Sequence, residues 1–223
     1  MSSIFHVIGP IMIGPSSSHT AGAVRLGLAG RAIAGARPTH AVLTLHGSFA
    51  QTYRGHGTDV ALVAGLLGLG PDDERIPNAF HLASEYGLEV RFEFADLGDV
   101  HPNTAKMELT APDGSVTSII GSSVGGGSIV ITRINQFDVE YHGEYNALIA
   151  SYTDQPGIIA KITSLLAAEN VNIATMRVSR EARNSRAMAV VELDQPISPE
   201  ARMLITRIQG VDGVMSLPPV ALA

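Results

Sequence analysis

The apolar residues of the second half of the chain repeat with the two periods that distinguish strands from helices. Short apolar runs and alternating positions predict strands, whereas apolar positions three and four apart predict helices. The predicted strands are 147–152, 171–179, 187–193 and 211–217, and the predicted helices are 156–169 and 199–209. This order is that of the ferredoxin-like βαββαβ fold, in which two helices cover one antiparallel sheet. We expect Asp154 to cap the first helix, with Pro156 and Gly157 at its start.

The first part of the chain has shorter apolar runs, separated by Gly, Ser and His. The predicted helices are 20–34 and 59–67, and the predicted strands or extended segments are 6–13, 41–45, 88–95, 106–110, 116–120 and 128–134. Pro112-Asp113-Gly114 supplies a hairpin turn between two of them. The fold class is therefore α+β, with a mixed N-terminal domain at 1–134 and a βαββαβ domain at 146–223. The boundary is expected between Asn135 and Tyr145.

Composition narrows the possible functions. The chain has 223 residues, 45% of them apolar and 16% charged, with a net charge of −6 and no basic run. That balance argues against nucleic-acid binding and leaves apolar surface for a partner protein. The absence of cysteine excludes thiol chemistry and any metal cluster bound by thiolates of this chain. We find no targeting signal and no membrane-spanning segment, so we expect a cytoplasmic protein.

A serine-rich loop precedes the first predicted helix and comprises Ser16, Ser17, Ser18, His19 and Thr20. The free N–H groups of a helix start, together with several hydroxyls, can bind a carboxylate or a phosphate. The simpler interpretation is a serine cap. One cap explains one serine, so we favour anion or substrate binding.

Two histidines next to glycine occur in His46-Gly47-Ser48 and His56-Gly57-Thr58-Asp59. Histidine can transfer a proton near neutral pH, and a nearby hydroxyl can orient a substrate. Taken alone, each histidine fits a structural role better than a catalytic one. A serine hydrolase can be drawn from these residues, but the chain has no nucleophile-elbow pattern.

Two further segments carry polar groups. His101-Pro102-Asn103-Thr104 leads into a strand, and the run from Gly121 to Ser128 contains three consecutive glycines. Those glycines permit close approach to a ligand, but on the glycines alone we favour a flexible hairpin. The histidines show no metal-ligand spacing, so we predict no metal ligand in this chain. Hydroxyls, amides and imidazoles suit a small zwitterion.

The chain resembles the β chains of the iron–sulfur-dependent L-serine dehydratase family along essentially its whole length. The resemblance rests on Ile8-Gly9-Pro10, the segments 14–22, 46–50 and 55–59, His101-Pro102-Asn103-Thr104, and Gly125-Gly126-Gly127-Ser128. The second part, with Asp154-Gln155-Pro156-Gly157 and Asn170-Val171-Asn172-Ile173, resembles an ACT domain. The first part is similar to the substrate-binding-type domain of some serine-biosynthetic dehydrogenases.

The resemblance implies conversion of L-serine to pyruvate and ammonia with a [4Fe–4S] cluster. The cysteines of a separate α chain would bind that cluster, and the ACT resemblance implies homodimerisation within a larger oligomer. An alternative function is that of a stand-alone, amino-acid-binding ACT regulator.

The resemblance also implies roles for individual residues. His56 would be the first candidate for proton transfer, and Thr58 and His19 would be further catalytic residues. The implied substrate-binding residues are Ser16, Ser17, Ser18, Thr20, Asn103 and Ser128. The base can instead come from the α chain. The ACT loop of Asp154, Gln155, Pro156 and Gly157 would bind an effector or only pack the domains together.

Overall fold

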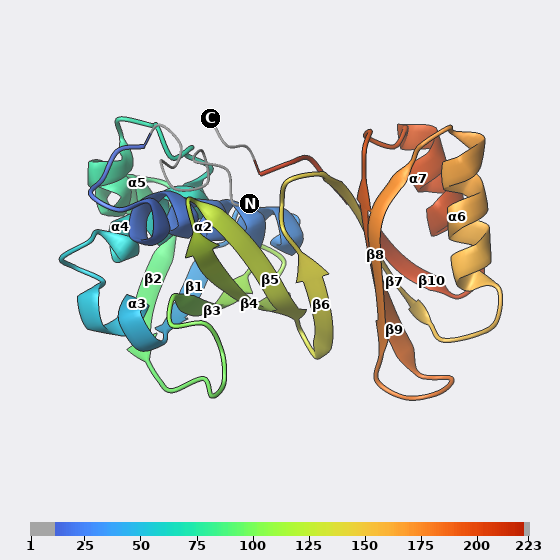
Figure 1. Ribbon diagram of the computed structural model, residues 1–223, viewed down its shortest axis with the longest axis horizontal. Helices are drawn as coiled ribbons and strands as arrows, with labels where there is room; N and C mark the ends of the chain where they lie inside the picture. Colours follow the sequence, from blue (N-terminus) through green and yellow to red (C-terminus); the bar gives the residue numbers. More distant parts are fainter. Residues whose placement is uncertain (1–11, 221–223) are drawn as a thin grey trace, which may run out of the picture. The chain divides into compact units, whose positions relative to one another are not determined.

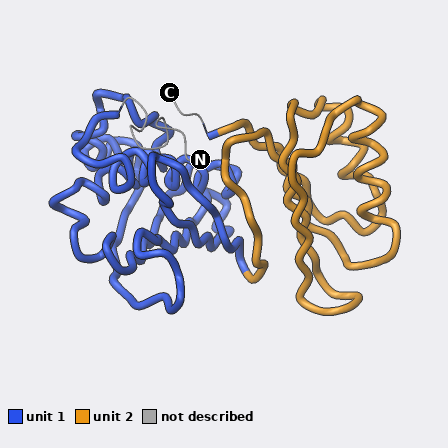
Figure 2. The backbone as a smooth tube through the Cα atoms, viewed as in Figure 1, with its two compact units in different colours: residues 1–135, 220–223 blue, residues 136–219 orange. Residues whose placement is uncertain are grey.

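The computed structural model describes residues 12–220, which form two compact units. Within that range, unit 1 comprises 12–135 and Val220, and unit 2 comprises 136–219 (Figure 2). The motif Ile8-Gly9-Pro10 and most of the extended segment predicted at 6–13 lie outside the described residues. None of the helices in the described range has the length and apolar character needed to cross a bilayer.

Unit 1 contains a mixed sheet, visible in Figure 1. Its strands are β1 (His40–Leu45), β2 (Glu89–Phe94), β3 (Thr104–Thr110), β4 (Val116–Gly125) and β5 (Ser128–Ile134). They lie in the order β2-β1-β3-β4-β5, with β1 and β2 parallel and the other pairs antiparallel. The chain alternates along β3, so that Ala105, Met107 and Leu109 are fully buried on one face of the sheet.

The helices of unit 1 carry or directly follow several residues of the candidate site. They are the short turn η1 (Ser17–Ala21), α2 (Gly22–Ala34), α3 (Gly47–Thr52), α4 (Thr58–Leu67), the turn η2 (Ile76–Asn78) and α5 (Ala79–Glu85). Helix α2 packs against β4 and β5, and α4 packs against α2. Both helices are buried along most of their length.

Unit 2 contains the predicted ferredoxin-like arrangement. Its elements are β6 (Phe137–Tyr141), β7 (Asn146–Thr153), α6 (Ile158–Ala168), β8 (Ile173–Arg180), β9 (Arg186–Leu193), α7 (Pro199–Thr206) and β10 (Val211–Leu217). The antiparallel order β10-β7-β9-β8 follows from the βαββαβ connectivity. Ile158, Ile162 and Leu166 of α6 pack against apolar residues of β7 and β9. The predicted α+β class is confirmed.

Some local predictions were wrong. Asp154 does not cap α6, because its carboxylate accepts hydrogen bonds from Arg180 Nη1 at 2.9 Å and from the Asn184 N–H at 3.3 Å. Gly157 is the N-cap instead, with φ of 91°, so α6 begins only at Ile158 and not at Pro156. This left-handed conformation favours glycine and interrupts a helix. Helices α3 and α5 and strand β6 were not predicted.

Candidate functional site

The candidate site of unit 1 lies where two helices begin. Helices α2 and α4 cross at Gly27 and Gly65, with almost no space between their backbones. A Cβ atom on Gly27 would lie 2.4 Å from the Leu62 carbonyl oxygen, and one on Gly65 would lie 2.1 Å from the Val24 carbonyl oxygen. Only glycine permits this approach.

The crossing brings two predicted histidines together. His19 precedes α2 and His56 precedes α4, each by a few residues. Their ring centroids are 4.7 Å apart, with the rings edge to face at 75°. The Phe49 ring of α3 makes a second edge contact with His19, at 5.4 Å. The two motifs, distant in sequence, therefore form one imidazole pair.

His19 is held by hydrogen bonds on both sides of its ring. Ser16 Oγ accepts the His19 backbone N–H at 3.2 Å, so Ser16 caps the turn, and it lies 3.4 Å from Nδ1. On the opposite side, Nε2 lies 3.0 Å from the hydroxyl oxygen of Ser48. Burial, and in second place the neighbouring His56, lower the pKa of His19 below its ordinary value of 6.5. His19 is therefore neutral at pH 7.

The stability of unit 1 should consequently depend on pH through His19. The unfolded chain, in which the pKa is about 6.5, binds more protons at mildly acid pH than the folded chain does. The contribution of His19 to the free energy of unfolding is therefore fully present above that pH and is lost as the pH falls through the lower folded pKa. In urea unfolding, His19→Gln should lose less stability than the unchanged chain between about pH 7 and pH 5. Equal losses would contradict the lowered pKa of the half-buried His19 imidazole.

His56 is anchored through its backbone rather than its ring. Its N–H donates to the Thr52 carbonyl at 3.0 Å, and its own carbonyl accepts the Thr20 hydroxyl at 3.2 Å. Among the described residues, neither His56 Nδ1 nor the buried hydroxyl of Thr58 has a hydrogen-bond partner. Buried polar atoms without partners are rare in native structures, and a catalytic or ligand-binding role is one of their known causes.

The other predicted residues differ in how they are connected to the histidine pair. Ser17 and Ser18 form the half-buried turn η1 beside His19. The Asn103 carbonyl accepts the Ser123 N–H at 2.9 Å, and the Ser123 hydroxyl lies against Gly22 at the start of α2. Ser128 begins β5 after the glycine turn and, within the described residues, takes no part in the hydrogen bonds around His19.

Sequence reasoning did not select Ser48 and Ser123 as site residues. Both lie in motifs that were noted, but neither motif shows which hydroxyl faces an imidazole or is buried. The Ser123 hydroxyl is fully buried and has no hydrogen-bond partner among residues 12–220. His46, the other histidine of these motifs, is structural, since its Nδ1 accepts the Leu97 N–H at 3.1 Å.

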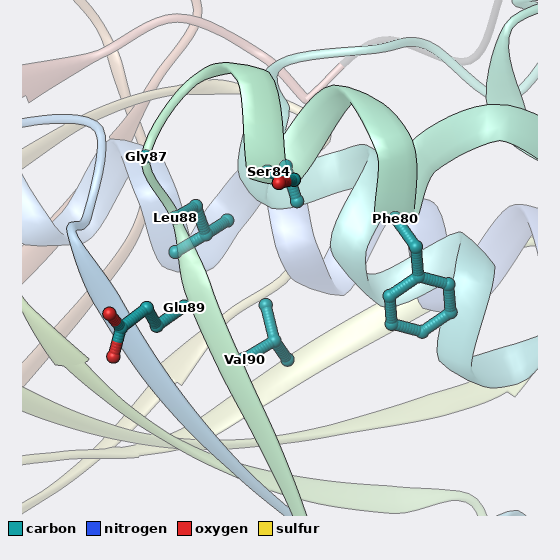
Figure 3. Close-up of a pocket in the computed structure, with 7 residues that line it drawn as sticks. Phe80, Ser84, Gly87, Leu88, Glu89 and Val90 are labelled. Carbon is teal, nitrogen blue, oxygen red and sulfur yellow. The ribbon is translucent and has the colours of Figure 1, made fainter.

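The imidazole pair is not part of a candidate metal site, and it does not line the hollow described next. No group of three or more His, Asp or Glu side chains that could bind a metal occurs within residues 12–220, and the chain has no cysteine. A hollow of about 320 Å³ lies between α5 and β2, where Phe80 and Val90 contribute to its walls (Figure 3). It contains no predicted site residue.

In unit 2, the predicted ACT loop is bound to its neighbours by hydrogen bonds. Asp154 joins the β8–β9 hairpin through Arg180, and the side-chain amide of Gln155 donates to the Gln209 carbonyl at 3.1 Å. Pro156 and Gly157 are exposed. A Cβ atom on Gly157 would meet nothing within 4 Å, so the loop is open at this point.

Comparison with known proteins identifies both parts of the chain. Residues 3–85 match the family model "Serine dehydratase beta chain", and residues 146–208 match "ACT domain". The L-serine dehydratase beta chain of Peptoniphilus asaccharolyticus is 40% identical over 93% of this chain and 94% of its own length. The probable L-serine dehydratase beta chain of Bacillus subtilis is 42% identical over 87% of this chain and 88% of its own length.

A third relative belongs to a different enzyme. D-3-phosphoglycerate dehydrogenase of a Synechocystis species is 30% identical over 80% of this chain but only 32% of its own length. This agrees with the predicted resemblance to serine-biosynthetic dehydrogenases. The two beta-chain relatives, in contrast, match along nearly their entire length. The chain therefore belongs to the serine dehydratase beta chain family.

Proposed function

We propose that this chain is the β subunit of a two-chain L-serine dehydratase, which converts L-serine to pyruvate and ammonia. The observation that carries the proposal is its match to 94% of the length of a relative named L-serine dehydratase, beta chain. The imidazole pair and the hydroxyls around it supply the chemistry that a small zwitterionic substrate requires.

A [4Fe–4S] cluster in such an enzyme would have to be held by the partner α chain. Without cysteine, and without a group of three metal-binding side chains in the described range, this chain offers no ligand set of its own. It does offer hydroxyls and imidazoles at an incomplete site, which fits a cluster brought by another subunit. When bound, the cluster supplies an open iron that acts as a Lewis acid toward the substrate. Thiolate ligation favours a reducing compartment, so we place the enzyme in the cytoplasm.

Within this site we assign proton transfer at the substrate Cα to His56. Its ring makes no hydrogen bond through Nδ1, so it is not committed to a structural partner. His19 fixes the position of that ring by edge-to-face contact. Thr58, two residues after His56, has a buried hydroxyl with no hydrogen-bond partner among the described residues.

The remaining predicted residues are assigned to substrate binding. Ser16, Ser17, Ser18 and Thr20 surround His19, and Asn103 lies beside the start of α2 through Ser123. Ser128 is the weakest of these assignments, because the glycine turn separates it from the histidines.

The experiment that tests this function is anaerobic coexpression with the cysteine-bearing α chain. We expect a copurifying complex that contains iron and forms pyruvate from L-serine. Formation of pyruvate by this chain alone, free of metal, would refute the proposal. Binding of serine by the isolated chain without any need for a partner would instead favour the stand-alone ACT regulator, which leaves the matched residues 3–85 without a role. Labelling by a fluorophosphonate would favour a hydrolase.

We assign effector binding to the ACT loop, at an interface between two copies of the ACT domain. The open surface at Gly157 and the left-handed φ of 91° support this assignment. Gly157→Val should abolish the response to an amino-acid effector, since a β-branched side chain both fills the opening and disfavours positive φ. Gly157→Asn tolerates that φ and should retain the fold as the matched control. Calorimetric titration with L-serine measures the effect, and unchanged binding in the valine variant would assign the loop to packing only.

A further inference from the structure

We propose that Ser16, His19 and Ser48 form a directed chain of hydrogen bonds that ends at the Ser48 hydroxyl, which donates its proton to the carboxylate of the substrate. This inference rests on the proposed function for the identity of the substrate. The contacts that make up the chain lie within unit 1 and do not depend on that function.

The chain begins at Ser16. Its oxygen accepts the His19 backbone N–H, which can only donate. A hydroxyl oxygen can accept twice, so the 3.4 Å contact with Nδ1 of His19 fits either direction; we assign the arrangement in which the Ser16 hydroxyl donates to Nδ1. A neutral imidazole that accepts at Nδ1 carries its proton on Nε2. In the assigned arrangement His19 is the Nε2–H tautomer.

The proton on Nε2 determines what Ser48 can do. Nε2–H donates to Ser48 Oγ at 3.0 Å, so the Ser48 oxygen is the acceptor in that bond. His19 is the only hydrogen-bond partner of this hydroxyl among residues 12–220, which leaves the Ser48 proton directed away from the imidazole. Ser48 is half-buried in the first turn of α3, and its backbone carbonyl is bound by the Thr52 hydroxyl at 2.9 Å. With the Nε2–H tautomer of His19, the Ser48 hydroxyl therefore keeps a donor that is not used within the described residues.

A carboxylate is the group that best fits a fixed hydroxyl donor at this position. It accepts several hydrogen bonds, and bonds to an ionised acceptor are about twice as strong as neutral ones. The ammonium group of L-serine has no acceptor. Donation along Ser16, His19 and Ser48 also polarises each successive bond, which strengthens the last one. The neutral state of His19, favoured by its burial, keeps this direction at pH 7.

The first test needs only this chain. With ¹⁵N-labelled histidine, long-range proton–nitrogen spectra distinguish the two neutral tautomers, and His19→Gln assigns the signals. We expect the Nε2–H tautomer in the unchanged chain and a larger share of the Nδ1–H tautomer in Ser16→Ala. Ser84→Ala, on α5, is the matched control and should leave the signals in place. A predominant Nδ1–H tautomer in the unchanged chain would overturn the proposal, because Ser48 would then donate to His19.

The second test uses the complex with the α chain. Ser48→Ala should raise KM for L-serine about tenfold or more, with a smaller change in kcat, because the lost bond is to a charged group. Ser48→Thr keeps the hydroxyl and should restore most of the affinity. An unchanged KM, or a loss in kcat alone, would overturn the assigned contact. A complex without any activity toward L-serine would refute the proposed function, while the tautomer of His19 would still decide the direction of the chain.

Discussion

Replacing His56 by alanine is expected to lower the turnover of L-serine by the assembled enzyme by about 10²-fold or more. The reason is that His56 Nδ1 has no hydrogen-bond partner among the described residues, so this ring is available to take up a proton. Both ring nitrogens of the neighbouring His19, in contrast, lie near serine hydroxyls. Steady-state production of pyruvate, measured anaerobically with the α chain present, gives the effect on kcat. The KM for L-serine should change less than kcat, since the proton is moved in the transition state.

His81→Gln is the matched control for this variant. His81 lies on α5, where its ring is exposed and pairs with Glu85 at 3.4 Å. We expect this substitution to leave kcat unchanged. If His56→Ala turns over L-serine as fast as the unchanged enzyme, His56 has no part in proton transfer, and the base belongs to the α chain.

Gly65→Ala is expected to destabilise unit 1 by about 1–3 kcal/mol or more, the cost of overpacking a close contact. The new Cβ atom would lie 2.1 Å from the Val24 carbonyl oxygen and 2.8 Å from Gly27 Cα, both of them backbone atoms that cannot turn aside. Helices α2 and α4 must therefore move apart, and the His19–His56 pair at their starts must separate with them. Urea unfolding measures the loss of stability.

The control for this prediction is Gly30→Ala on α2. There the new Cβ atom would meet side-chain ends and no backbone atom among its nearest neighbours, with Met107 Cε at 3.0 Å and Leu109 Cδ1 at 3.4 Å. Because alanine is a better helix former than glycine by about 1 kcal/mol, we expect little net change. If Gly65→Ala were as stable as Gly30→Ala, the close crossing of α2 and α4 would not be required for the fold.

The ferredoxin-like unit was the most predictable part of the fold. Its strands and helices each carry a complete hydrophobic period, as in the Ile158, Ile162 and Leu166 face of α6, so local sequence suffices to recognise them. The elements that escaped prediction are short. Helix α3 has six residues and begins at Gly47, which has a positive φ of 56°, and β6 has five residues in a segment expected to be a connection. Segments of this length show too few periods to be distinguished from loops.

The failed cap at Asp154 has a different cause. Aspartate before a helix is a common capping signal, but the sequence does not show that Arg180 and Asn184 approach the same carboxylate from the β8–β9 hairpin. An ion pair with arginine and a backbone N–H bond compete with the cap for the same oxygens.

By itself, the sequence determined the kinds of chemical groups that this protein offers: hydroxyls and imidazoles in glycine-rich motifs, no thiol, and a second domain whose periodicity specifies its fold. Only the tertiary structure decided how those groups combine. It places His19 beside His56 and Ser48, joins Ser123 to the start of α2, and leaves His46 with a structural bond. The physical reason is that these contacts join segments far apart in the sequence, as does the close approach of α2 and α4 at Gly27 and Gly65, and no local pattern encodes such long-range packing.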